Sequence, residues 1–275
     1  MRICFIGGGN MASALINGLT RDEHNNAVIS MVDPSEQARA AISGSYEVTT
    51  HAQLPAAADR AEIIVLAVKP QVMPQVLEQL AEALAGEGGT PPLIVSVAAG
   101  ITCSQISAGL GLPVPVVRTM PNTPALLGAG ITALFANDRC SSQQRNQAEQ
   151  LMRSAGAVVW VEKEELLDAV TAVSGSGPAY FYLLTEAIQE AGVRQGLDVE
   201  TARLLATHTA HGAGLMLLEG GADATELRRR VTSPGGTTQA AIESLVQGGF
   251  GQLVAEAVQA ATRRSRELSG PGGSS

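Results

Sequence analysis

A short apolar segment that runs directly into a glycine-rich turn restricts the fold of this chain more than any other feature. Residues 2–6 are predicted to form a strand, and Gly7-Gly8-Gly9-Asn10-Met11-Ala12 follows with the pattern G-x-G-x-x-A. Gly7 permits a tight turn, Gly9 lets the backbone approach a pyrophosphate, and Ala12 permits close packing of helix against strand. The first amide groups of the following helix would face the phosphates. The pattern therefore predicts a βα unit that binds a dinucleotide.

Strands and helices alternate through the first part of the chain. Further strands are predicted at residues 28–32, 61–68, 93–97, 114–118, 131–136 and 158–161, and helices at 10–19, 36–42, 70–84, 104–108 and 142–155. The segment 61–68 is almost entirely apolar, as expected for a strand whose two faces are covered by helices. The alternation predicts an α/β dinucleotide-binding domain over residues 1–161, with a Rossmann-like, doubly wound parallel sheet.

From about Lys163 onward the predicted elements are all helical. Helices are expected at residues 164–192, 200–219, 225–232 and 238–268, with breaks at glycines such as Gly248-Gly249. Pro178 falls inside the first of these helices and is expected to kink it. Residues 162–268 therefore form a predicted all-helical domain, and 269–275, rich in Gly and Ser, a predicted disordered tail.

Composition excludes several classes of protein. The formal net charge of -8 argues against a nucleic-acid surface, which needs a basic face. No apolar run reaches about 18 residues, so no membrane span is expected. The first six residues form a strand rather than a signal peptide. Cys4, Cys103 and Cys140 are odd in number and widely scattered, which suits a reducing cytoplasm better than a disulfide framework.

Several strand ends carry residues that could contact the cofactor, because ligands of open parallel sheets lie at the carboxyl ends of the strands. Asp33 follows the second predicted strand and would favour the ribose hydroxyls of NAD, whereas Ser35 and Arg39 could favour the 2′-phosphate of NADP. The preference is left open at this point. The predicted cofactor-binding set is Ile6, Gly7, Gly8, Gly9, Asn10, Met11, Asp33, Ser35, Ala67, Val68, Lys69, Pro70, Ala98, Ala99 and Gly100.

Two other segments have the composition of loops that fit closely around a small ligand. Residues 118–125 read RTMPNTPA, and residues 233–238 read SPGGTT. Both combine the fixed backbone of proline with hydroxyl or amide groups, and the second adds permissive glycines.

Together with the turn at 7–11, AVKP at 67–70, AAG at 98–100 and GSGPAY at 175–180, these segments resemble the pyrroline-5-carboxylate reductase family over nearly the whole chain. The resemblance implies transfer of a hydride from NADPH, with NADH as the alternative, to the imine carbon of 1-pyrroline-5-carboxylate, which gives L-proline. It also implies dimers joined through the helical domain, which in the family often build decamers. The active site would lie between the nucleotide domain of one subunit and helices of its partner.

The resemblance assigns roles to the loop at 233–238. Thr238 would bond the ring nitrogen as the catalytic residue, and Ser233, Gly235, Gly236 and Thr237 would shape the carboxylate pocket. Two positions depart from the family pattern: Asp33 replaces a hydroxyl or amide at the strand end, and residues 49–54 lack an asparagine near the adenosine.

The residues themselves favour an imine over a ketone. A ketone reductase must supply a proton to the developing alkoxide. Hydroxyacid dehydrogenases of similar architecture use a lysine on the first long helix of the second domain, yet residues 168–192 contain no Lys or Arg. An iminium arrives already protonated and needs only positioning. Tyr180 is an alternative donor, although packing is favoured for it, and His208 and His211 lack further metal ligands nearby. A hydroxyacid-type dehydrogenase and a non-catalytic dinucleotide-binding sensor remain the alternatives.

Overall fold

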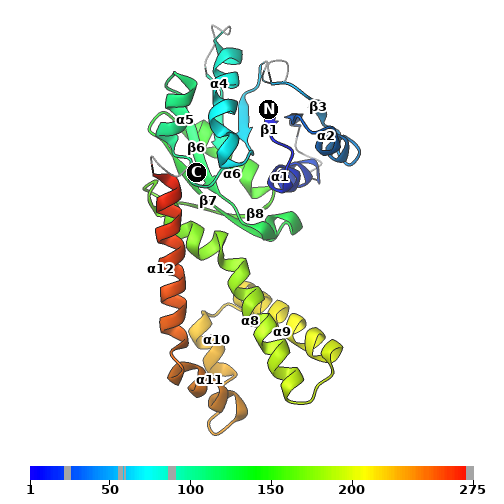
Figure 1. Ribbon diagram of the computed structural model, residues 1–275, viewed down its shortest axis with the longest axis vertical. Coiled ribbons are helices and arrows are strands. Elements are labelled where there is room, and N and C mark those ends of the chain that lie inside the picture. Colours follow the sequence, from blue (N-terminus) through cyan, green and yellow to red (C-terminus); the bar gives the residue numbers. More distant parts are fainter. Residues whose placement is uncertain (22–25, 55–57, 59, 86–90, 271–275) are drawn as a thin grey trace. The chain divides into compact units, whose positions relative to one another are not determined.

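Eight strands form one sheet, in the order β3-β2-β1-β4-β5-β6-β7-β8, in a computed structural model that describes residues 1–21, 26–54, 58, 60–85 and 91–270. The elements of the sheet-containing part are β1 (Arg2–Ile6), α1 (Asn10–Arg21), β2 (Val28–Val32), α2 (Glu36–Ser43), β3 (Thr49–His51), β4 (Ile63–Leu66), η1 (Pro70–Val72), α4 (Met73–Leu84), β5 (Leu93–Ser96), α5 (Cys103–Leu110), β6 (Val116–Met120), η2 (Thr123–Leu127), β7 (Gly130–Ala136), α6 (Ser142–Arg153) and β8 (Gly156–Trp160). Figure 1 shows these elements in sequence colours from blue to green.

The helices and turns that follow the sheet agree with the predicted change to all-helical structure. They are α7 (Leu166–Val170), the π-helical turn η3 (Thr171–Gly175), α8 (Gly177–Arg194), α9 (Val199–Glu219), α10 (Ala224–Arg230), α11 (Thr237–Gln247) and α12 (Phe250–Ser269). Within the described residues, no helix is long and apolar enough to cross a membrane.

The sheet confirms the predicted fold class, with β7 and β8 running opposite to the other six strands. β1 pairs in parallel with β2 and β4, and β5 in parallel with β4 and β6. β7 is antiparallel to β6, with Met120 opposite Ala133. A parallel pair needs a long crossover, and only the short η2 joins these two strands, so β7 turns back beside β6.

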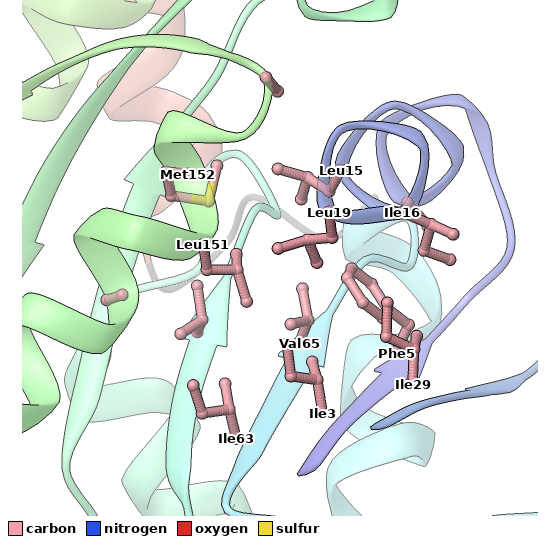
Figure 2. Packing of buried hydrophobic residues seen from close by; sticks show 14 of the residues in the cluster. Ile3, Phe5, Leu15, Ile16, Leu19, Ile29, Ile63, Val65, Leu151 and Met152 are labelled. Carbon is pink, nitrogen blue, oxygen red and sulfur yellow. The ribbon is translucent and has the colours of Figure 1, made fainter. Parts of the chain in front are cut away.

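Apolar side chains fill the space on both faces of the sheet. On one face Phe5 and Val65 from the strands meet Leu15 of α1 and Leu151 of α6, as Figure 2 shows. On the other face the strand residues Ile64 and Ile94 lie in a second buried cluster that includes residues of α4 and α5. Burial on both faces explains why the central strands are continuous apolar runs rather than alternating ones.

Two expectations for the first long helix differ from the structure, and one short strand was not expected. The helix expected at residues 164–192 is divided into α7, η3 and α8, and Pro178 lies in the first turn of α8 rather than inside a helix. Proline is accepted there because the first amides of a helix have no intrahelical partner, so the expected kink was wrong. The break expected at Gly248-Gly249 is confirmed: it separates α11 from α12, and Gly249 has a φ of 80°. The short strand β3 was not predicted because Thr49–His51 lacks an apolar pattern.

Two compact units make up the chain. Unit 1 comprises Met1–Gly175 and Ala261–Ser275, and unit 2 comprises Ser176–Ala260. The predicted division after residue 161 therefore falls earlier than the division between the units. α7 and η3 belong to unit 1, in which α7 lies against β6 and β7 and its residue Asp168 accepts a hydrogen bond from Ser265 of α12. The predicted tail falls largely at 271–275, outside the described residues.

Candidate functional site: a dinucleotide turn and a glycine loop

The glycine-rich turn has the geometry that close approach of a phosphate requires. Gly7 has a φ of 101°, and its N–H donates to the carbonyl of Val32 at 2.8 Å. A Cβ atom at Gly7 would lie 2.6 Å from the carbonyl oxygen of Ala67, whereas one at Gly9 would meet no heavy atom within 4 Å. α1 begins directly afterwards at Asn10. The turn is thus tight on its inner side at Gly7 and open at Gly9, beside the N-terminus of a helix.

The predicted cofactor residues lie at the carboxyl ends of four neighbouring strands, β2, β1, β4 and β5. They therefore share one edge of the sheet, which is where open α/β sheets bind ligands. The segment 67–70 follows β4, with Lys69 exposed, and the segment 98–100 follows β5, with Ala99 exposed between two buried residues. Gly100 has a φ of 77° and lies against Leu268 near the end of α12.

A pocket of about 500 Å³ lies at this edge. Ile6, Gly7, Asp33 and Val68 of the predicted set line it. The remaining described lining residues are Val32, Pro34, Ala52, Gln53, Leu54, Val72, Gln75, Val76, Gln79 and Glu82. Its size and largely aliphatic walls suit the adenosine half of a dinucleotide. The sequence predicted no contact with the cofactor for residues 52–54, which the structure places in the pocket wall.

Asp33 is the most constrained polar residue at this edge. Its Oδ2 accepts the N–H of Gly8 at 2.8 Å, and its Oδ1 accepts the N–H of Ser35 at 2.8 Å. The Oγ of Ser35 accepts the N–H of Ala38 at 3.3 Å and so caps α2. The carboxylate therefore joins the glycine turn to the end of β2.

The predicted substrate loop connects α10 to α11 in unit 2. Gly235 has a φ of 71° and donates its N–H to Oε1 of Gln239 at 2.6 Å, and Gly236 donates its N–H to the carbonyl of Ser233 at 3.0 Å. Gly236 is the N-cap of α11 and has no side-chain cap bond. The N–H groups of Thr237 and Thr238 thus begin an 11-residue helix, a position that attracts anions. This loop and the cofactor turn belong to different units.

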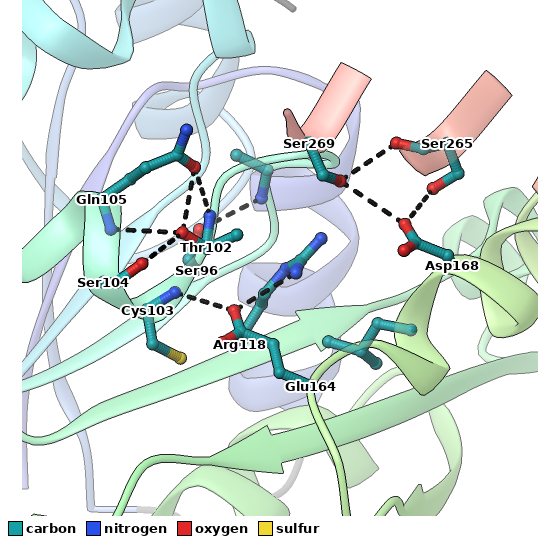
Figure 3. A network of polar contacts seen from close by, with 12 residues as sticks. Ser96, Thr102, Cys103, Ser104, Gln105, Arg118, Glu164, Asp168, Ser265 and Ser269 are labelled. Carbon is teal, nitrogen blue, oxygen red and sulfur yellow. Dashed lines mark hydrogen bonds and ion pairs between the residues drawn. The ribbon is translucent and has the colours of Figure 1, made fainter. Parts of the chain in front are cut away.

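The segment 118–125 turns out to support unit 1 through a network that Figure 3 shows. Arg118 is buried on β6 and donates to Oε1 of Glu164 at 3.2 Å, and the same oxygen accepts the N–H of Cys103 at 2.8 Å. Asn122 donates to the carbonyl of Ser174 at 3.2 Å. The segment therefore joins β6 to the start of α5 and to η3.

A second part of the network attaches the end of the chain to α7. Asp168 is buried, and its Oδ1 accepts the hydroxyl of Ser265 at 2.7 Å and that of Ser269 at 3.4 Å (Figure 3). Sequence analysis had not singled out Glu164, Asp168 or Ser265. The pairs are 46 to 101 residues apart, so no local spacing indicated them.

The tyrosine and histidine candidates of the helical part lie apart from these networks. The hydroxyl of Tyr180 on α8 is buried and has no hydrogen-bond partner among the described residues, whereas the neighbouring Tyr182 is 65% exposed. His208 and His211 are exposed on α9. Among the described residues, no group of three or more His, Cys, Asp or Glu side chains lies close enough together to hold a metal ion.

The sheet and its glycine turn define a dinucleotide-dependent oxidoreductase, and comparisons with known proteins agree. Residues 2–100 match the family described as NADP oxidoreductase coenzyme F420-dependent, and residues 164–268 match the one described as pyrroline-5-carboxylate reductase dimerisation. Pyrroline-5-carboxylate reductase of Pseudomonas aeruginosa is 49% identical over 97% of this chain and 96% of its own length. The chain therefore belongs to the pyrroline-5-carboxylate reductase family.

Solved structures show the same relationship. A pyrroline-5-carboxylate reductase from Coxiella burnetii superposes with a TM-score of 0.91 at 41% identity, covering 98% of both chains. A Plasmodium falciparum pyrroline carboxylate reductase with NADP bound superposes with a TM-score of 0.82 at 28% identity, again covering 98% of both chains.

Proposed function

We propose that this chain reduces 1-pyrroline-5-carboxylate to L-proline, the last step of proline biosynthesis. The observation that carries the proposal is the uncapped N-terminus of α11 behind the Gly235 turn, in a chain 49% identical to the reductase of Pseudomonas aeruginosa. A helix start preceded by glycines presents backbone N–H groups to a carboxylate. The substrate has one carboxylate and one ring nitrogen, so two points of contact orient it.

The roles in the loop follow from the chemistry of the two substrate groups. The N–H groups of Thr237 and Thr238 at the start of α11 would hold the carboxylate, and Ser233, Gly235 and Gly236 would shape the turn around it. In the protonated iminium the ring nitrogen donates a hydrogen bond, which the hydroxyl oxygen of Thr238 accepts. Together with the carboxylate contact, it would fix which face of the ring lies toward the nicotinamide.

The turn at 7–11 and the adjoining pocket fit a dinucleotide. Gly9 leaves open space where the pyrophosphate would approach, and the pocket of about 500 Å³ can hold the adenosine. When bound, the reduced nicotinamide would supply a hydride, that is, a proton together with two electrons, to the iminium carbon. Lys69 and Pro70 after β4, and Ala98 and Ala99 after β5, complete the proposed binding edge.

The iminium explains why α8 can lack a general acid. Residues 168–192 contain no Lys or Arg, and a ketone would need a donor for the developing alkoxide. When hydride adds to an iminium, the former π electrons become the lone pair of the amine nitrogen, and no proton is needed in that step. The missing lysine thus disfavours a hydroxyacid substrate.

The proposal extends to assembly and location. The chain carries the region described as the family's dimerisation region, and unit 2 exposes many large apolar side chains, among them Phe181 and Leu218. We therefore include a homodimer, with a homodecamer built from dimers, and a cytoplasmic location. The three cysteines are free, as in a reducing compartment.

Initial rates of NADPH and NADH oxidation with pyrroline-5-carboxylate, with L-proline identified as the product, test the proposal. Turnover with proline formation supports it. Cofactor binding without turnover on this substrate would contradict it and favour a sensor. Turnover only with a 2-hydroxy or 3-hydroxy acid in the reverse direction would instead favour a hydroxyacid-type dehydrogenase.

A further inference from the structure

NADH and NADPH differ at a single position, the 2′-oxygen of the adenosine ribose, which carries a phosphate in NADPH. The resemblance to the family implies NADPH. The contacts at the end of β2 favour NADH instead. We propose that this protein uses NADH in preference to NADPH and that Asp33 determines this preference. The kinetic test of this inference rests on the proposed reductase function, whereas the binding test does not.

Asp33 is held in place by backbone groups on three sides. Its two carboxylate oxygens accept the N–H groups of Gly8 and Ser35, each at 2.8 Å, and its own N–H donates to the carbonyl of His51 at 3.1 Å. A carboxylate oxygen has capacity for a second hydrogen bond, so both can still accept a ribose hydroxyl. A 2′-phosphate has no hydrogen to donate when ionised and would be repelled by the fixed charge.

The groups that could instead bind a phosphate are held by the backbone, although each keeps donors without a partner among the described residues: the hydroxyl hydrogen of Ser35, and Nη2 and Nε of Arg39. The Oγ of Ser35 caps α2 by accepting the N–H of Ala38. The guanidinium of Arg39 donates through Nη1 to the carbonyls of Asp33 and Pro34, at 2.7 and 2.9 Å. Arg39 is thereby fixed on the backbone of the β2–α2 connection. For it to pair with a phosphate through this nitrogen, it would have to give up both bonds, with Asp33 still beside the phosphate.

The charge around the pocket points the same way. Asp33 and Glu82 line it, and none of its described lining residues is Lys or Arg. Lys69 follows the lining residue Val68 but is exposed and does not itself line the pocket. Binding of a dianionic phosphate would therefore add like charge to a site that already carries two carboxylates.

Binding of the two carriers can be measured without the reaction, through the change in nicotinamide fluorescence on titration. We expect the wild-type protein to bind NADH at least about tenfold more tightly than NADPH, as expected for hydrogen bonds to a charged group. Asp33→Asn preserves the shape and one acceptor oxygen for the turn, and it should shift the ratio of dissociation constants toward NADPH by about tenfold or more. Asp33→Ser, which removes the carboxylate altogether, should shift the ratio in the same direction.

Arg39→Ala is the matched control at the same strand end. It should change the ratio of dissociation constants by less than about threefold, because Arg39 bonds the backbone rather than the 2′ position. Thermal denaturation of each variant checks that the unit folds, and Asp33→Asn keeps the test available if Asp33→Ser does not fold. Tighter binding of NADPH by the wild type would overturn the inference. So would an unchanged ratio in Asp33→Asn, or a larger shift in Arg39→Ala than in Asp33→Asn.

The kinetic test uses the ratio of kcat/KM for the two carriers at saturating imine. We expect the same order and the same shifts as in the binding experiment. A preference in binding that persists in a protein without imine turnover would contradict the proposed function and support this inference. Imine turnover with a preference for NADPH would support the proposed function and contradict this inference.

Discussion

Gly7 and Gly9 are two residues apart in one turn, yet alanine at each position should act on a different property. At Gly7 an alanine would need a φ near 101°, which costs about 1–2 kcal/mol for a residue with a Cβ atom. The new Cβ would also lie 2.6 Å from the carbonyl oxygen of Ala67 and 3.0 Å from Cγ1 of Val68. Relief of that overlap requires a shift of packed backbone, at about 1–3 kcal/mol.

The sum for Gly7→Ala is a loss of about 2–5 kcal/mol in the free energy of unfolding, or a fall in Tm of roughly 4–20 °C for a unit of this size. Gly9→Ala meets no atom within 4 Å, so its Tm should stay within about 2 °C of the wild type. In the proposed binding mode the same Cβ would stand where the pyrophosphate approaches, so the dissociation constant for the dinucleotide should rise at least about tenfold.

Thermal denaturation without ligand and fluorescence titration of the dinucleotide separate the two effects. Wild-type dinucleotide affinity in Gly9→Ala would refute the assignment of the turn to phosphate binding. An unchanged Tm in Gly7→Ala would refute the strain calculated from the contact with Ala67.

Three further substitutions or measurements test other parts of the molecule. Thr238→Ala should lower kcat/KM for the imine about tenfold or more with little change in cofactor affinity, and equal losses in both would contradict its role. Glu164→Gln weakens the bond to buried Arg118 and should cost about 1–3 kcal/mol in urea denaturation, so an unchanged midpoint would count against the network. Burial, with the nearby Glu164 carboxylate, raises the pKa of the Cys103 thiol to about 12, so at pH 8 it stays a thiol and iodoacetamide should label it far more slowly than in the unfolded chain. Rapid labelling of Cys103 in the native protein, located by peptide mass spectrometry, would show that the thiol is not buried as described.

The sequence predicted best the features that are local in the chain. The turn at Gly7 and the buried strand around Val65 follow from spacing and apolar runs within a few residues, and both lie as expected. The kink at Pro178 was wrong because proline inside a helix and proline at its first turn look alike until the start of the helix is known. The antiparallel β7 was missed because a short connection was not weighed against the crossover that a parallel strand needs.

The supporting network could not be predicted because its partners are distant in the chain. Arg118 stands in a segment whose composition suggested a ligand loop, and only its bond to Glu164 shows that it supports β6 and α5. Asp168 would be taken for a solvated residue near a helix start, yet it is 7% exposed and bonded to Ser265. Long-range pairs of this kind leave no periodicity for sequence analysis to detect.

Unit 2 has too few buried side chains to be stable by itself. Ala202 and Ala206 are its only buried hydrophobic residues among those described, whereas Phe181, Leu183 and Leu218 are 65, 66 and 84% exposed. Each large apolar side chain that becomes buried contributes about 1.5–3 kcal/mol, so covering this surface is worth more than the whole stability of an ordinary domain. The match to the dimerisation region of the family indicates that a second copy covers it. Folding of unit 2 and dimer formation are then expected to be one equilibrium, so the stability of the unit that carries the glycine loop at 233–238 should depend on protein concentration.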